Sequence, residues 1–206
     1  MKTWLLAIIC MAMCVPVAMS GATINVLTGP TGWQVTSPSL VPTTPFVTDS
    51  SGFPFPPWAP AANGAPDWIS PNASYVGGAA TDVPGIWAFT YTFNVPTPST
   101  PATLTGTMGF DNWLNAVLLN GNSLGLSEAS SQFGGTWPVN LSGLALQLGT
   151  NELTFLVQNL AGATGNPVGL YTDLTLTYQA IPEPSTWMML ASGLGLALMA
   201  RRRVRG

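Results

Sequence analysis

The sequence predicts an all-β domain, a two-sheet antiparallel sandwich, flanked by an N-terminal signal helix and a C-terminal hydrophobic helix. Between residues 21 and 180, apolar and polar side chains alternate repeatedly, and no helical period of 3.6 residues is sustained. An Asn-Gly dipeptide between two apolar runs marks a hairpin. About 160 residues is enough for one hydrophobic core, so we expect a single domain over 21–180.

The predicted strands begin at an aromatic run. One face of this first strand carries Trp87, Phe89, Tyr91 and Phe93. Alternating residues point to one face of a strand, so these rings are expected to line the core. Later alternating runs predict further strands at 103–110, 144–148, 153–157 and 168–178.

The hairpin is predicted from Val117 to Leu124, with Asn120-Gly121 at its turn, because both central positions of the favoured turn need a positive φ. The segment 38–84 is different, because it is rich in Pro, Gly, Ser and Thr and has few alternating runs. It is therefore expected to form ordered loops that bury their aromatic residues.

The first 20 residues are typical of a secretory signal peptide. A basic start precedes the apolar stretch from Trp4 to Val17, and Ala18-Met19-Ser20 supplies the small residues that a signal peptidase reads. Cleavage is expected after Ser20 or after Ala22. A retained membrane helix is the alternative interpretation.

Residues 181–206 form a second signal. The Pro182-Glu183-Pro184 tripeptide precedes an apolar run at 187–200, and a basic cluster follows: Arg201, Arg202, Arg203 and Arg205. Fourteen helical residues rise about 21 Å, against about 30 Å of hydrocarbon. The run can hold the chain in a membrane with its arginines on the cytoplasmic side, but it is short for a permanent span.

This three-part tail resembles the PEP-CTERM sorting signal of Gram-negative bacteria. The resemblance implies that an exosortase recognises Pro182, Glu183 and Pro184 and removes the tail, after transient inner-membrane anchoring through 187–200. The protein would then reach the cell surface or the medium. Such proteins typically occur in bacteria that make extracellular polysaccharide, which is the partner implied. An uncut membrane anchor with an ordinary Pro-Glu-Pro linker is the alternative.

A second resemblance covers residues 84–178. Its motifs, in chain order, are Val95-Pro96, 102–106, Asp111-Asn112, 117–121 and 148–155. This order resembles the galactose-binding-like jelly roll, which serves as a non-catalytic accessory module in many glycosidases and surface proteins. The resemblance implies a jelly-roll-like arrangement of the two sheets and a role in binding.

The placement of charge excludes several functions. Between 21 and 180 there is no Lys, Arg or His, while seven carboxylates remain: Asp49, Asp67, Asp82, Asp111, Glu128, Glu152 and Asp173. Without cations the domain cannot neutralise phosphates, so no nucleic acid is expected as a partner. Histidine acid–base chemistry, a Schiff-base lysine and an arginine clamp are excluded too. Both cysteines lie in the signal, at Cys10 and Cys14, which argues against disulfides and zinc.

No enzyme and no cofactor are predicted. The carboxylates are scattered singly, and no Gly-x-Ser-x-Gly motif occurs. Sugar sites pair aromatic rings with Asp, Asn and Gln, and the candidate ligand-binding residues of these types are Trp58, Trp68, Asp111, Asn112 and Trp113. The alternative is that the rings plug the core and that Asp111-Asn112 caps a turn. Calcium at Asp111, Asn112 or Asp173 is chemically conceivable, but the spacing matches no EF-hand and we assign no metal site.

We therefore expect an exported, non-catalytic surface or matrix protein with a structural or adhesive role in extracellular polysaccharide. A dedicated carbohydrate-binding module and an uncleaved, membrane-anchored periplasmic domain are the alternatives.

Overall fold

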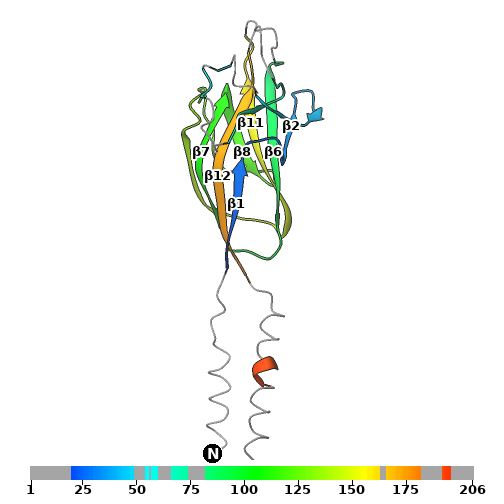
Figure 1. Ribbon diagram of the computed structural model, residues 1–206, viewed down its shortest axis with the longest axis vertical. Helices are drawn as coiled ribbons and strands as arrows, with labels where there is room; N and C mark the ends of the chain where they lie inside the picture. The colour runs from blue at the N-terminus through cyan, green and yellow to red at the C-terminus, as the bar shows by residue number, and fades with distance from the viewer. Residues whose placement is uncertain are drawn as a thin grey trace, which may run out of the picture.

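The computed structural model describes residues 20–48, 54–55, 57–59, 66–73, 82–162, 166–181 and 192–195. Within them, the chain forms twelve β-strands in two antiparallel sheets (Figure 1). The strands are β1 Ser20–Leu27, β2 Trp33–Thr36, β3 Pro42–Thr43, β4 Phe46–Val47, β5 Ile69–Ser70, β6 Gly85–Val95, β7 Ala102–Asp111, β8 Trp113–Leu119, β9 Asn122–Ser123, β10 Trp137–Leu144, β11 Gly149–Asn159 and β12 Gly169–Ala180. The predicted all-β, jelly-roll-like sandwich is confirmed.

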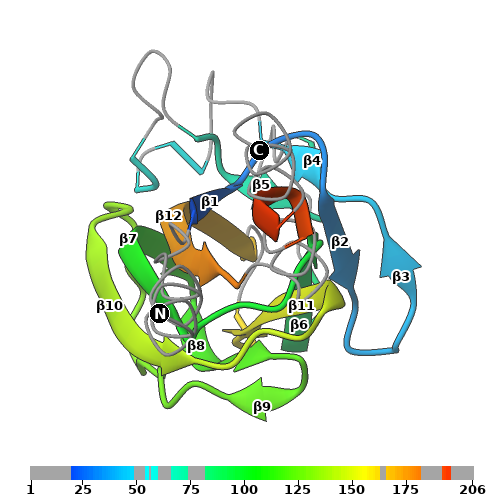
Figure 2. The same ribbon diagram turned by 90° about the horizontal axis from the view of Figure 1, so that it is seen from below.

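The two sheets lie face to face, as the view along the long axis shows (Figure 2). One sheet has the order β3-β2-β6-β11-β8-β9. The other has the order β10-β7-β12-β5-β4, and β1 pairs with the same edge of β12 beyond β5. Strands that neighbour each other in space are therefore often far apart in the chain.

The core between the sheets is made by the alternating faces that the sequence indicates. Trp87, Phe89 and Phe93 of β6 are buried, as are Leu153, Phe155 and Val157 of β11. From β12, the buried side chains include Leu170, Leu174, Leu176 and Tyr178. Burying a large apolar side chain is worth about 1.5–3 kcal/mol, so these faces hold the sheets together.

The predicted hairpin is confirmed at the turn between β8 and β9. Asn120 has φ 51° and Gly121 has φ 78°, the left-handed values that this turn requires. The Asn120 side chain also ties the turn to β11: its Oδ1 accepts from Glu152 N at 2.9 Å, and its Nδ2 donates to Asn151 Oδ1 at 2.9 Å.

One predicted strand is wrong. The alternating leucines at 144–148 lie mostly beyond β10, which ends at Leu144, and Leu148 is 65% exposed. The register of β10 against β7 shifts between Leu141 and Leu144, and Gly143 takes φ 75°. Pairing resumes after this bulge with Leu144 opposite Ala102, which is the first residue of β7, so the ladder ends there and the remaining leucines follow a loop.

Strand β1 was not predicted, although it runs beside β12 for its whole length. Its register starts with Ser20 opposite Ala180 and ends with Leu27 opposite Asp173. The other end of β12 faces β7, where Gly169 is opposite Asp111. The twelve residues of β12 therefore span the sandwich, from the chain ends to the Asp111 loops (Figure 1).

The sorting residues lie outside the described residues: Pro182, Glu183, Pro184, Arg201, Arg202, Arg203 and Arg205. So does the signal segment before Ser20. Of the apolar run, 192–195 form a single helical turn. No described helix has the length and apolar character to span a membrane.

Candidate functional site

A buried carboxylate organises the end of the sandwich opposite the chain ends. Asp111 closes β7 and is 3% exposed. Its Oδ2 accepts from Trp58 Nε1 at 2.9 Å, and its Oδ1 accepts from Asn112 Nδ2 at 2.6 Å and from Ser131 Oγ at 3.3 Å. Burial raises the pKa of Asp111 to about 6, because loss of hydration penalises the carboxylate more than these three donors stabilise it; the charge of Asp82 adds to the rise.

A network of amides extends from this carboxylate into the neighbouring loops. Asn112 Oδ1 accepts from Leu160 N at 2.7 Å. Asp82, which is also buried, accepts from Val168 N at 2.8 Å and from Asn72 Nδ2 at 2.6 Å. These bonds fix loops from distant parts of the chain against the turn between β7 and β8.

Trp58 and Trp68 lie beneath this network and face no solvent. Each is 1% exposed, and their rings stack with centroids 4.5 Å apart. Trp68 Nε1 donates to Ala59 O at 2.9 Å, and the Trp58 ring lies so close to Gly169 that a Cβ there would overlap it. The expectation that a ligand contacts these two rings is therefore wrong, because both rings fill the interior at the loop end. Asp111 is buried too, so it holds the neighbouring loops in place and is not accessible to a ligand.

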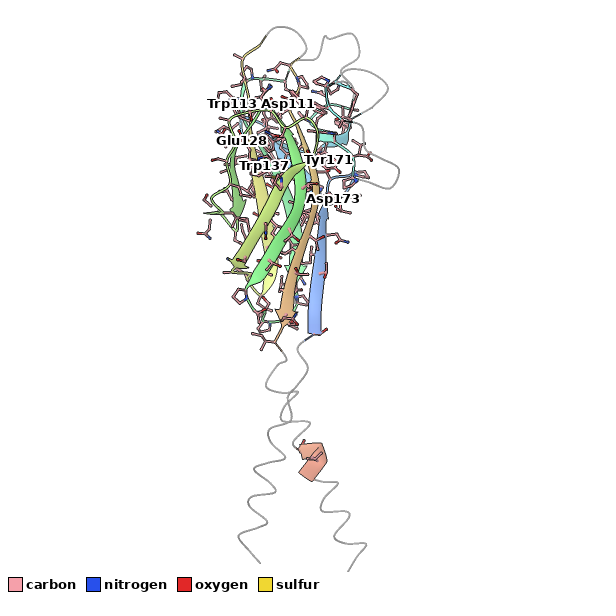
Figure 3. All side chains as sticks on the ribbon, turned by 90° about the vertical axis from the view of Figure 1, so that its left-hand side faces the viewer. Asp111, Trp113, Glu128, Trp137, Tyr171 and Asp173 are labelled. Atoms are coloured by element: carbon pink, nitrogen blue, oxygen red, sulfur yellow. The ribbon has the colours of Figure 1, made fainter. Side chains whose placement is uncertain are left out.

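Trp113 is the sequence-predicted tryptophan that the structure leaves accessible. It begins β8, is 38% exposed and lies near Glu128 at the loop end (Figure 3). A shallow groove of about 380 Å³ is lined by Trp113, Leu114, Asn115, Ser127, Glu128 and Ala129. We call it the Trp113 groove.

Residues 127–129, which line the groove opposite Trp113, are held against β8 by backbone hydrogen bonds. Leu114 N donates to Glu128 O at 2.9 Å, and Glu128 N donates to Leu114 O at 2.8 Å. Ser130 Oγ donates to Glu128 Oε1 at 2.8 Å. Ser131, next in the chain, donates to buried Asp111, so the network below the groove also positions its wall.

Sequence reasoning missed the three polar residues that line the groove beside Trp113: Asn115, Ser127 and Glu128. They gather because an isolated bridge brings 127–129 onto β8, and a single bridge leaves no periodic signal in the sequence.

The acids considered for calcium do not lie together. Asp173 is opposite Thr107, whereas Asp111 is opposite Gly169. Among the described residues, no three His, Cys, Asp or Glu side chains gather as a metal site would need.

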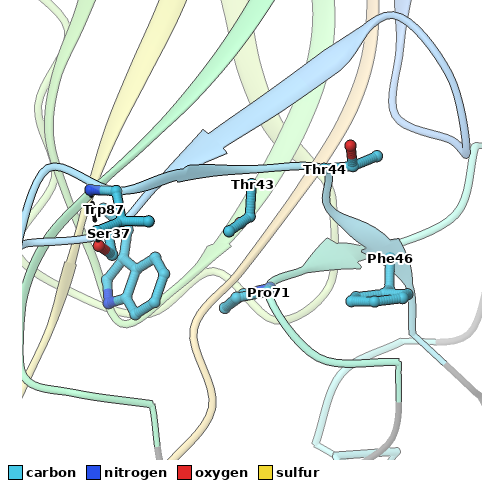
Figure 4. A pocket seen from close by; sticks show the side chains of 7 residues that line it. Ser37, Thr43, Thr44, Phe46, Pro71 and Trp87 are labelled. Atoms are coloured by element: carbon cyan, nitrogen blue, oxygen red, sulfur yellow. Dashed lines mark hydrogen bonds between the residues drawn. The ribbon is translucent and has the colours of Figure 1, made fainter.

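A second, larger groove lies where the chain crosses from one sheet to the other, between edge strands β3 and β4 (Figure 4). It measures about 470 Å³ and is lined by Ser37, Val41, Thr43, Thr44, Phe46, Pro71 and Trp87. Phe46 is 51% exposed, and none of the lining residues is charged. We call it the Phe46 groove.

The C-terminal end of the chain matches a known family. Residues 180–204 match the family described as the PEP-CTERM protein-sorting motif. The chain carries a PEP-CTERM sorting motif. This motif indicates an exported, membrane-passing protein that an exosortase processes. The match confirms that the C-terminal tail is a PEP-CTERM sorting signal, as the sequence analysis predicts. The comparison with curated proteins found no match.

Solved structures similar to this chain include carbohydrate-binding modules. A family 35 module from Clostridium thermocellum shares 11% identity at a TM-score of 0.39, covering 76% of this chain and 97% of that one. A family 35 module from Cellvibrio japonicus Abf62 shares 15% identity at 0.40, covering 80% and 100%. A putative beta-galactosidase from Bacteroides fragilis shares 19% identity at 0.40, covering 79% of this chain but 23% of the other. At these identities and scores, the similarities assign no ligand to this chain.

Proposed function

We propose that this protein is a non-catalytic domain that contacts extracellular polysaccharide through the Trp113 groove, after an exosortase has released it to the surface or matrix of a Gram-negative bacterium. Its role is structural or adhesive. The observation that carries the proposal is the groove itself, which combines a half-exposed indole with a carboxylate, an amide and a hydroxyl.

These groups suit a sugar. A pyranose ring presents an apolar C–H face that packs on an aromatic ring, and its hydroxyls need hydrogen-bond partners at the edge of that contact. Trp113 offers the ring, and Asn115, Ser127 and Glu128 offer the partners. The paired backbone of Leu114 and Glu128 keeps them in register, which makes a dedicated carbohydrate-binding module the second candidate.

The position of the groove also supports the proposal. Asp111, two residues before Trp113, lies opposite Gly169 at the start of β12, and Ser20 lies opposite Ala180 at its end. At about 3.4 Å per residue, the groove and the processed chain ends are about 35 Å apart. If the matrix or surface holds the domain near its processed C-terminus, the Trp113 groove therefore stays open to polymer.

The carboxylates support a non-catalytic role. Glycoside hydrolysis needs two carboxyl groups that face each other across the substrate, about 5–10 Å apart. Among the residues that the structure describes, Glu128 is the one acid that lines the Trp113 groove. The nearby Asp111 is buried, and its oxygens accept hydrogen bonds from Trp58, Ser131 and Asn112. Among the described residues, Glu128 has no accessible acid partner within the groove.

Binding is tested with the exported, processed protein on a panel of immobilised polysaccharides. Trp113→Ala should lose at least about tenfold in affinity, because the ring contributes most of the apolar contact. Phe46→Ala is the matched control, since it removes a half-exposed ring from the other groove. Absence of binding to every polymer, or equal loss in both variants, would overturn the proposal.

Processing is tested by the intact mass of the exported protein. Loss of the tail near Pro182 to Ser185 is expected. Protein found only with its full C-terminus in the membrane would instead support the uncleaved, anchored periplasmic domain.

A further inference from the structure

We infer that the polysaccharide bound in the Trp113 groove carries primary ammonium groups, as a partly de-N-acetylated amino-sugar polymer does. The inference rests on the proposed function and names the chemical class of its ligand. It is carried by the charge of the domain and by the groups that line the groove.

The first argument is the charge of the domain as a whole. Between residues 21 and 180 there are seven carboxylates and no Lys, Arg or His. An acidic polysaccharide would be repelled from this surface, and no described basic side chain could pair with its charge. A polymer with ammonium groups is attracted to the same surface and gains a faster association rate.

The second argument is the carboxylate in the groove. Glu128 Oε1 accepts from Ser130 Oγ at 2.8 Å, while Oε2 has no hydrogen-bond partner among the described residues. Glu128 is partly exposed and lines the groove beside Trp113. A carboxylate with a free oxygen pairs with an ammonium group more strongly than with a hydroxyl, because the hydrogen bond is charge-assisted.

The third argument is the indole of Trp113. An aromatic face attracts a cation through its quadrupole, and tryptophan does so best. Its Nε1 has no acceptor among the described residues, so it can donate to a neighbouring sugar hydroxyl. Trp113 precedes Leu114 in the chain, and Glu128 is the bridge partner of Leu114, so the ring and the negative charge line the same groove. Both side chains are labelled near the loop end in Figure 3.

The Phe46 groove serves as an internal comparison. It is larger and has a more exposed ring, but none of its lining residues is charged. A neutral sugar could pack there equally well, whereas an ammonium group would find no carboxylate. Of the two grooves, only the Trp113 groove therefore adds a carboxylate of its own to the attraction that the charge of the domain provides.

The test compares one amino-sugar polymer in two forms, fully N-acetylated and partly de-N-acetylated, at a pH where the free amines are protonated. The two forms share rings and linkage and differ in charge. The processed protein is expected to bind the de-N-acetylated form about fivefold more tightly or better, and added salt should reduce that preference. Glu128→Gln should weaken binding to the de-N-acetylated form about three- to fivefold more than it weakens binding to the acetylated form, because only the charged ligand loses an ion pair.

Glu152→Gln is the matched control, because it removes the same charge from an exposed residue beside Leu119, at the far end of β8. It should bind as the unsubstituted protein does. Equal loss in both variants would overturn the inference, since the attraction would then come from net charge. Equal binding of both polymer forms, still abolished by Trp113→Ala, would overturn it and leave the proposed function standing. If neither form nor any other polymer binds, both fail.

Discussion

Replacing Asp111 with asparagine should remove a pH dependence of stability that the buried carboxylate creates. Burial raises the pKa of Asp111 from 3.8 to about 6, so the folded protein holds this proton more tightly than the unfolded chain. Stability from this group is therefore greatest below about pH 4, falls as the pH rises to about 6 and is constant above that. The difference in pKa corresponds to about 3 kcal/mol.

Asparagine resembles the protonated aspartic acid, because both are neutral and both offer an acceptor and a donor. At pH 4 the variant Asp111→Asn should therefore be about as stable as the unsubstituted protein, within the roughly 1 kcal/mol of one altered hydrogen bond to Trp58 or Ser131. At pH 7 it should be more stable, by up to about 3 kcal/mol.

Urea unfolding at several pH values between 4 and 7 measures the free energy of unfolding of both proteins. The difference between the two values isolates Asp111, because the other carboxylates contribute equally to both. Glu152→Gln, an exposed acid, is the control and should show a constant difference. A constant difference for Asp111→Asn as well would refute the argument that desolvation dominates at this site.

Two further substitutions test the fold. Gly169→Ala places a Cβ against the Trp58 ring and should destabilise the protein by about 3 kcal/mol, measured by thermal or urea unfolding; unchanged stability would mean that Trp58 does not pack there in solution. Gly121→Ala forces alanine to φ 78° in the hairpin and should cost about 1–2 kcal/mol. Gly134→Ala is its control, since a Cβ there meets only Thr136 Oγ1 at 3.5 Å and should cost less than half as much. Equal losses at both glycines would contradict the turn geometry.

Much of the sandwich could be predicted because its signals are local. Alternation identified the inner faces of β6, β11 and β12, and the Asn120-Gly121 dipeptide identified the hairpin. The same rule failed at Leu146 and Leu148, because the partner strand β7 begins at Ala102, opposite Leu144, and the ladder that alternation assumes ends there. Strand β1 was missed because its assignment depends on β12, about 150 residues further along the chain.

The candidate site was predicted less well. Five residues were named, and the structure brings them to one end of the sandwich, but it buries Trp58, Trp68 and Asp111 and leaves Trp113 accessible. Periodicity could not separate these tryptophans, because all three lie in or beside loops where no alternation applies. The groove partners of Trp113 come from a loop that reaches β8 through one backbone bridge.

The sequence by itself determined the charge distribution, the sorting motif at 180–204 and the β-sandwich class, because each depends on residue type and spacing along the chain. Only the tertiary structure decided which rings face solvent and which carboxylate lines a groove. Exposure depends on what packs over a side chain, and that is set by partners remote in sequence: Trp58 bonds to Asp111 across 53 positions, and Asp82 holds Val168 across 86. The two acids Asp111 and Glu128, which a charge count treats alike, differ in the fold: Asp111 is buried, whereas Glu128 is partly exposed and lines the Trp113 groove.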